Sequence, residues 1–104
     1  MREKKRYLLL KIESPQPFLA EEAKRLAYSA VFELLGEAGA SRAGFALKEF
    51  NESKQQAIVR CANASSLEQV IAALAAKRFY EGKDVAIRLL RVSGMIGKLS
   101  EQKQ

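Results

Sequence analysis

The sequence predicts an α+β domain whose elements follow one another in the order β-α-β-β-α-β. Segment 6–13 alternates apolar and polar residues, as a strand with one buried face does. Segments 19–35 and 66–78 carry apolar residues at helical spacing. Three further segments have the composition and length of strands: 45–51, 56–61 and 85–92.

This order is typical of the split βαβ arrangement, the ferredoxin-like (RRM-like) fold. We expect a four-stranded antiparallel sheet with two helices packed on one face. Residues 95–104 are expected to add a short C-terminal helix. The length of 104 residues fits one domain, 1–104, with 1–5 as a basic N-terminal arm.

The first strand has two different faces. One face is aliphatic, with Leu8, Leu10 and Ile12, and we expect it to point into the core. The other face is mixed and holds Tyr7, Leu9, Lys11 and Glu13. Pro15 and Pro17 end the strand, because proline has no backbone N–H to donate to a sheet.

The first helix is predicted from an unbroken i, i+3, i+4 apolar stripe within 19–35. Gly36 or Gly39 is expected to end it, since glycine commonly follows the last helical residue. Segment 40–44 then reads as a short loop of small residues that carries one cation, Arg42.

A β-hairpin should follow, with strands at 45–51 and 56–61 and a polar turn at 51–55. Its second strand ends at Cys61. No partner for a disulfide or a zinc site is available, so Cys61 is interpreted as a small buried apolar residue.

The second helix should begin at Ser65 or Ser66, because Ser65 and Glu68 have the spacing of a capping box. Lys77 and Arg78 would occupy its last turn, where cations suit the helix dipole.

The last strand, 85–92, follows a turn at 81–84 and is aliphatic except at Arg88 and Arg91. Arg88 fits a structural ion pair as well as it fits a contact to a ligand.

The composition argues against an autonomous enzyme. The chain has no histidine, one cysteine and a single aspartate, Asp84, which excludes His-based triads and ordinary zinc sites. The single cysteine also suits a reducing compartment. No apolar run is long enough to span a membrane, and the apolar run 7–10 is too short for a signal peptide, so we expect a cytoplasmic protein.

The charge instead favours a polyanionic partner. Eighteen basic and 12 acidic residues give a net charge of +6, and each phosphate that a cation neutralises releases counterions. We therefore predict contacts to RNA from eight residues: Lys4, Lys5, Arg6, Tyr7, Arg42, Arg60, Arg91 and Lys98.

Base stacking on the open face of the sheet is disfavoured. The strand 56–61 reads QAIVRC and has no aromatic residue, which leaves Tyr7 as the one stacking candidate. The apolar residues Leu9 and Ile58 indicate that a partner or the C-terminal segment covers part of this face.

Backbone-directed binding by arginine remains. Arg42 has small neighbours, so its guanidinium is free to bind a phosphate with two hydrogen bonds. Its alternative role is that of a surface arginine at a helix C-terminus. Arg60 is expected on the open face, and its alternative role is an ion pair with Glu13 or Glu49.

Two other function classes fit the fold. A ferredoxin-like acylphosphatase would need an anion-binding loop after the first strand, but Glu13–Pro17 has neither glycine nor a cation. A regulatory or metabolite-binding domain without RNA stays open, although no residue pattern points to its ligand.

Four motifs resemble a known family: Arg6-Tyr7-Leu8-Leu9, GEAGASRA at 36–43, Ala57-Ile58-Val59-Arg60-Cys61 and Val92-Ser93-Gly94-Met95-Ile96. In this order they are similar to archaeal ribonuclease P protein component 2. That family is shared with a eukaryotic subunit of ribonuclease P and of the related ribonuclease that processes ribosomal RNA.

The resemblance implies a non-catalytic subunit of a ribonucleoprotein endoribonuclease that removes the 5′ leader from precursor tRNA. Ribonuclease P RNA would perform the hydrolysis with Mg²⁺ bound to the RNA, and the protein itself would bind no cofactor. The implied protein partner is component 3, a TIM-barrel-like subunit, in an assembly with two copies of each protein.

Overall fold

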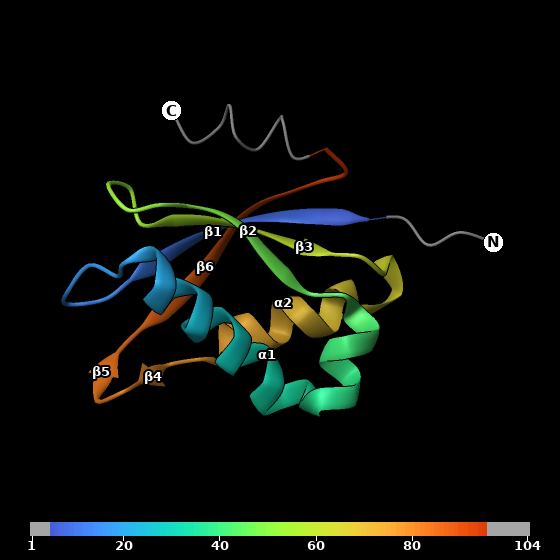
Figure 1. Cartoon of the computed structure of the whole chain (residues 1–104), viewed down its shortest axis with the longest axis horizontal. Helices are drawn as coiled ribbons and strands as arrows, with labels where there is room; N and C mark the ends of the chain where they lie inside the picture. The colour runs from blue at the N-terminus through green and yellow to red at the C-terminus, as the bar shows by residue number, and fades with distance from the viewer. Residues whose placement is uncertain (1–4, 96–104) are drawn as a thin grey trace.

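The computed structural model describes residues 5–95, in which two helices pack on one face of an antiparallel sheet (Figure 1). The sheet has four strands in the spatial order β2 (Ala46–Asn51), β3 (Gln56–Cys61), β1 (Arg6–Glu13) and β6 (Ala86–Ser93). All its neighbouring pairs are antiparallel. This confirms the ferredoxin-like arrangement predicted from the order of elements.

The core lies between the sheet and the helices α1 (Ala20–Ala43) and α2 (Leu67–Ala76). Leu8, Leu10 and Ile12 of β1 point into it, as their alternation predicts. Leu8 and Leu26 are fully buried, and burial of such a side chain stabilises the fold by roughly 1.5–3 kcal/mol.

Helix α1 is broken at Gly36 but does not end there. Gly36 has φ 72° and ψ 175°, after which a second helical segment continues to Ala43. The loop predicted at 40–44 is therefore wrong: alanine favours helix more than glycine opposes it over this short segment. Arg42 consequently lies in the last turn of a helix.

The true end of α1 is Gly44, which sits in the left-handed region at φ 60° and donates its backbone N–H to the Ser41 carbonyl over 3.1 Å. A Cβ at this position would lie 2.5 Å from Cβ of Ala62. Both the backbone conformation and the close approach of Ala62, the residue after β3, therefore require glycine here.

The beginning of α2 differs from the predicted capping box. A 3₁₀ turn at Ala64–Ser66 precedes the helix, and the Asn63 side chain accepts the backbone N–H of Ser65. Ser66, at the N-cap, makes no capping hydrogen bond with its side chain. The asparagine outcompetes the serine because its carbonyl reaches two residues along the chain.

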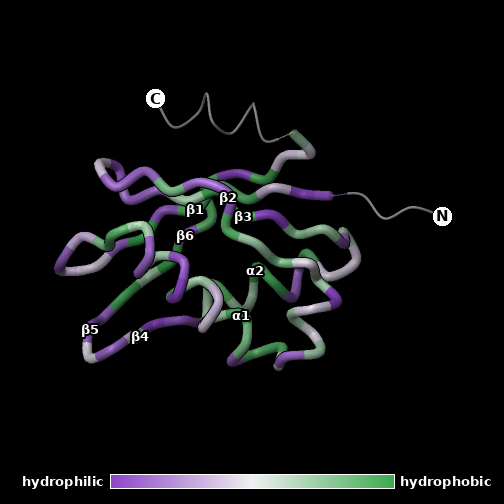
Figure 2. Tube along the Cα trace, viewed as in Figure 1, coloured by the Kyte–Doolittle hydropathy of each residue, from purple (hydrophilic) through white to green (hydrophobic). Residues whose placement is uncertain are grey.

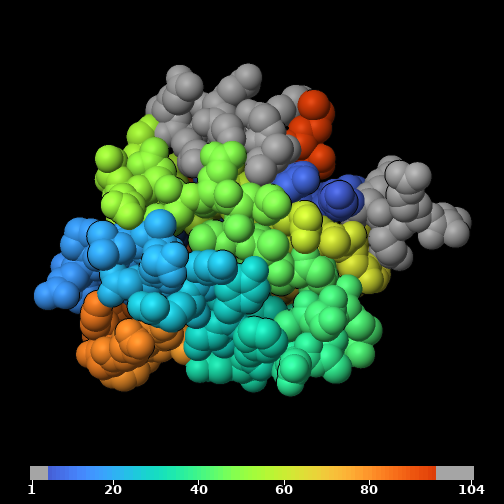
Figure 3. Space-filling view, viewed as in Figure 1, coloured from blue at the N-terminus to red at the C-terminus, as the bar shows by residue number. Residues whose placement is uncertain are grey.

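Lys77 and Arg78 lie past the end of α2. The predicted turn at 81–84 is part of a small hairpin of β4 (Phe79–Tyr80) and β5 (Lys83–Asp84). In Figure 3 the hairpin (orange) lies against the beginning of α1 (blue). Lys77 anchors it: its Nζ lies 2.7 Å from Oε2 of Glu33 and 5.5 Å from the centre of the Tyr80 ring.

The last strand, β6, begins one residue later than predicted and ends at Ser93. Four earlier predictions lie outside the described residues: the basic arm before Lys5, Lys4 itself, Lys98 and the C-terminal helix. None of the helices within 5–95 is long and apolar enough to cross a membrane.

Candidate functional site

One end of the sheet gathers most of the predicted RNA-binding residues. There β1 begins and β3 ends, so that Arg6 is opposite Cys61 and Tyr7 is opposite Arg60. The end of α1 reaches the same place, because the Ala62 backbone N–H donates to the Ala43 carbonyl over 2.9 Å. We call this region the basic end; its members are Lys5, Arg6, Tyr7, Arg42 and Arg60.

Arg60 lies on the open face, between Tyr7 on β1 and Ala46 on β2. Its Nε is buried and has no hydrogen-bond partner among the described residues. Of the two ion pairs suggested for Arg60, the one with Glu13 is wrong, because Glu13 pairs with Arg88, with 3.4 Å between Oε2 and Nη2. The one with Glu49 stays a prediction. Leaving a buried guanidinium nitrogen without a partner is costly, and this Nε is itself shielded from an incoming ligand.

Arg91 is exposed on β6 directly opposite Leu9, and the pairing places it on the open face as well. Leu9 and Ile58, its apolar neighbours across the sheet, are 3% and 0% exposed, and Tyr7 packs against them. The open face is therefore an apolar centre with arginine on either side. Leu9 and Ile58 are thus buried, while their covering by a partner or by the C-terminal segment stays a prediction.

Arg42 is exposed on the last turn of α1. In this position its charge complements the helix dipole, which is the alternative role considered for it. At this end of the helix the planar guanidinium group still faces solvent. Arg42 can therefore interact with the helix dipole and also contact a phosphate.

The first two residues of the basic end are coupled to each other. Arg6 Nη1 donates to the Lys5 carbonyl over 3.0 Å and lies near Gly94, at the exit of β6. Lys5 is exposed. Lys5 and Arg6 therefore lie at the end of the sheet where β1 begins and β6 ends.

Two further cations were not predicted as binding residues. Lys11 and Arg88 are opposite each other on the open face, one row beyond Leu9 and Arg91. Lys11 donates to the Lys54 carbonyl, and Arg88 pairs with Glu13. The alternation in the first strand already placed Lys11 on this face, and the structural ion pair considered for Arg88 is confirmed.

Another residue that the sequence did not single out is Gln55, at the turn between β2 and β3, where φ is 54°. Its side-chain amide accepts the Phe18 backbone N–H over 2.7 Å and donates to the Phe18 carbonyl over 2.9 Å. This amide fixes the entry to α1, at the end of the sheet away from the basic end. Its role is structural.

Cys61 is a buried thiol, as predicted. Its Sγ donates to the Asn63 carbonyl over 3.1 Å. Burial raises the pKa of the thiol above its ordinary value, and the hydrogen bond lowers it by less. The neutral thiol is a poor nucleophile at neutral pH.

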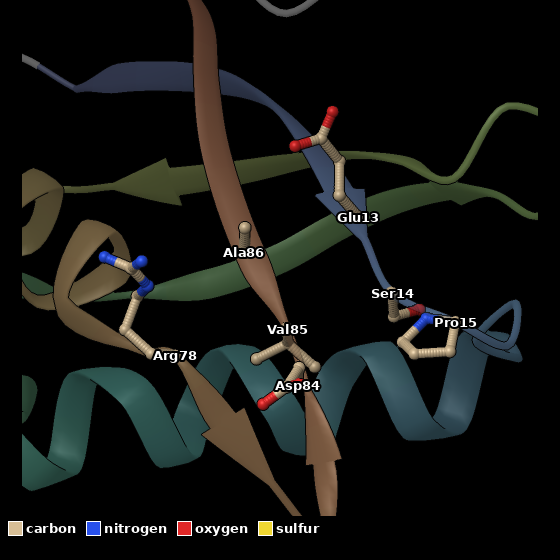
Figure 4. Close-up of a pocket in the computed structure, with 7 residues that line it drawn as sticks. All are labelled: Glu13, Ser14, Pro15, Arg78, Asp84, Val85 and Ala86. Atoms are coloured by element: carbon tan, nitrogen blue, oxygen red, sulfur yellow. The ribbon is translucent and has the colours of Figure 1, made fainter.

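A hollow of about 370 Å³ opens at the other end of the sheet and is lined by Glu13, Ser14, Pro15, Arg78, Asp84, Val85 and Ala86. In Figure 4 the carboxylates of Glu13 and Asp84 point away from each other. Since Glu13 is also occupied by Arg88, the charged groups do not converge on a common point. In the described part of the chain, no three His, Cys, Asp or Glu residues could hold a metal ion together.

Comparison with known proteins assigns the chain to a family. Residues 6–103 match the model of the Rpp14/Pop5 family. The chain belongs to this family. All members of the basic end of this Rpp14/Pop5 protein except Lys5 lie within the matched residues 6–103.

Three curated relatives of this Rpp14/Pop5 chain are named ribonuclease P protein component 2. The proteins from Pyrococcus furiosus and Pyrococcus horikoshii are each 33% identical to it over 102 residues, which covers 98% of this chain and 84% of theirs. The protein from Pyrococcus abyssi is 32% identical and is covered to 86%.

A solved structure confirms the fold of this family member. A chain of the cryo-EM structure of yeast ribonuclease MRP superposes with a TM-score of 0.71 and 13% sequence identity. The match covers 99% of this chain and 93% of that one.

Proposed function

We propose that this chain is a non-catalytic protein subunit of ribonuclease P that supports a catalytic RNA in removing the 5′ leader from precursor tRNA. The observation that carries the proposal is the similarity over nearly the whole chain to proteins named ribonuclease P protein component 2. Hydrolysis belongs to the RNA and to Mg²⁺ bound there, and the protein binds no cofactor.

The residues support this division of labour. The chain has no histidine, and its one thiol is buried and held in the neutral form. The carboxylates at the hollow beside β6 point apart. These groups do not form a converged acid–base pair at the hollow, whereas the net charge of +6 suits binding to RNA.

The basic end is the surface that contacts the RNA backbone. Arg42 and Arg60 offer planar guanidinium groups, which bind phosphate oxygens through paired hydrogen bonds. Lys5 and Arg6 add charge beside them, and Arg91, Lys4 and Lys98 extend the set. Tyr7 packs against Leu9 and Ile58, so it lends the surface shape and one hydroxyl group rather than a platform for bases.

The partners follow from the same assignment. They are ribonuclease P RNA and protein component 3, in an assembly with two copies of each protein. Precursor tRNA is the substrate of the whole complex, which works in the cytoplasm.

Reconstitution tests the proposal. The chain is added to ribonuclease P RNA, with and without component 3, and release of the 5′ leader is measured at several Mg²⁺ concentrations. We expect the chain to raise the cleavage rate when RNA is present and RNA-free protein to cleave nothing. A metabolite-binding domain would leave the rate unchanged, and metal-dependent cleavage by RNA-free protein would overturn the proposed roles.

A further inference from the structure

A small hollow of about 190 Å³ lies at the break in α1, on the helical side of the sheet. Gly36 turns the chain there, and in Figure 1 the last segment of α1 leads at an angle toward the start of β2. Residues before the break, residues after it and the residue before β2 therefore line one space. We call it the aromatic hollow, and its lining residues are Tyr28, Phe32, Glu37, Ala40, Ser41 and Phe45.

Three aromatic rings form the apolar part of this hollow. The rings of Tyr28 and Phe45 are nearly perpendicular, at 85°, with their centres 5.3 Å apart. The Phe32 ring is inclined by 29° to that of Tyr28, with 6.4 Å between the centres. Phe45 is 8% exposed and Phe32 is 44% exposed. Two rings thus make a corner, and the third leaves an accessible aromatic surface beside it.

The electrostatics of the aromatic hollow favour a cation. The face of an aromatic ring carries the negative part of its quadrupole. Glu37 is exposed, and its carboxylate forms no hydrogen bond or ion pair with another residue of the described range 5–95. None of the lining residues is basic. Figure 2 shows hydrophobic (green) and hydrophilic (purple) stretches next to each other in this part of α1.

We propose that the aromatic hollow is a binding site for a quaternary ammonium group. Such a cation is attracted to ring faces and to a carboxylate, and its methyl groups pack against the rings. The volume of about 190 Å³ suits a head group, because pockets for drug-sized ligands have roughly 300–1,000 Å³.

Other ligand classes fit the hollow less well. A primary ammonium group has three N–H donors, and the polar side-chain groups that line the hollow are one carboxylate, of Glu37, and the hydroxyls of Tyr28 and Ser41. Each donor left unpaired on leaving water is costly. A nucleotide would stack its base on Phe32, but its phosphate would be repelled by the Glu37 carboxylate.

The site is separate from the basic end. Ser41 precedes Arg42 in the sequence, but Arg42 does not line the hollow. Binding of a small cation requires neither RNA nor a protein partner. The inference therefore does not depend on the proposed function, and a failure of one leaves the other standing.

Nuclear magnetic resonance titration of the full-length chain, alone and at physiological salt, tests the inference. Choline supplies the quaternary ammonium group, ethanolamine is the same molecule without the methyl groups, and dimethylbutanol has the shape of choline without its charge. We expect choline to shift the resonances of Tyr28, Ser41 and Phe45. Ethanolamine and dimethylbutanol should each bind at least about fivefold more weakly than choline.

Two substitutions remove the groups that attract the cation. Glu37→Gln and Phe32→Leu should each weaken choline binding by about fivefold or more, because one removes the carboxylate and the other an aromatic face. The matched controls are Glu68→Gln and Phe79→Leu, which change exposed residues of the same types outside the hollow and should leave the affinity unchanged. Thermal melting establishes that each variant is folded, and the comparison of the three ligands needs no variant.

A further titration distinguishes two sources of the ligand. The N-acetyl amide of trimethyllysine presents the same cation as a methylated protein side chain does. Tighter binding of choline would support a free metabolite as the ligand, and tighter binding of trimethyllysine would support a modified protein.

Three results would overturn the inference. The first is equal affinity for choline and dimethylbutanol, which would reduce the hollow to an apolar surface. The second is an equal loss in Glu37→Gln and Glu68→Gln, which would show that only the net charge matters. The third is a shift of the hollow's resonances by adenosine monophosphate but not by choline, which would assign the rings to a nucleobase.

Discussion

The two edges of the sheet are built differently. The β2 edge belongs to a hairpin, and Leu47 and Phe50 turn inward onto the core while Lys48 is exposed. The β6 edge carries three exposed aliphatic residues in the five positions from Arg88 to Val92. Within residues 5–95, the β2 edge buries its aliphatic side chains and the β6 edge leaves three of them exposed. Exposed aliphatic side chains on a sheet edge therefore indicate that a domain works as a subunit of a larger assembly.

The largest effect is expected from breaking the β2 edge at its entry. Gly44→Ala should destabilise the protein by about 3 kcal/mol, because alanine resists the left-handed conformation and its Cβ would meet Ala62. Urea unfolding followed by circular dichroism measures the change. Gly82→Ala is the control: its φ is also positive at 81°, but a Cβ there meets nothing within 4 Å, so about 1 kcal/mol is expected. Equal losses in both variants would contradict the steric argument.

A direct comparison of the two edges comes next. Leu47→Lys on β2 should cost about 2 kcal/mol, because Leu47 packs against the core. Leu90→Lys on β6 should change the free energy of unfolding by no more than about 0.5 kcal/mol, since Leu90 is 42% exposed at a bulge. The same urea titrations compare them. A destabilisation by Leu90→Lys as large as that by Leu47→Lys would show that the β6 edge is complete in the isolated chain.

The smallest effect concerns RNA affinity and should leave the fold intact. Arg42→Ala and Arg60→Ala should each lower the slope of log binding constant against log salt by about one unit, because one phosphate contact is lost. The slope is measured by titrating ribonuclease P RNA at several salt concentrations. Lys24→Ala removes an exposed cation from the beginning of α1 and should leave the slope unchanged. An unchanged slope in both arginine variants would remove them from the RNA surface.

Local patterns predicted the strands well. The bounds of the first and third strands follow from alternation and proline, and they agree with β1 and β3 at both ends. The open-face positions of Tyr7, Leu9 and Arg60 follow from the same period of two. These features depend on neighbours in sequence, which is why the sequence alone determines them.

The features that the sequence did not predict depend on distant contacts. Gln55 binds Phe18 across 37 positions of the chain, and no local pattern marks a glutamine for that role. The hairpin of β4 and β5 has strands of two residues, too short for periodicity, and is held by Lys77 and Lys83 against aromatic rings. Arg42 was assigned to a loop because glycine after a long stripe usually ends a helix, whereas here it only breaks one.

The break at Gly36 also reconciles the length of α1 with the shorter length of the strands it packs on. A straight helix of the 24 residues in α1 would be about 36 Å long, whereas the eight residues of β1 span only about 26 Å. An unbroken α1 would extend past the end of the sheet and carry Arg42 away from β1 and β3. The turn at Gly36 redirects the last segment so that Ala43 meets Ala62. The place of Arg42, which we propose contacts RNA, thus depends on a mismatch between helix and strand lengths that is resolved six residues before it.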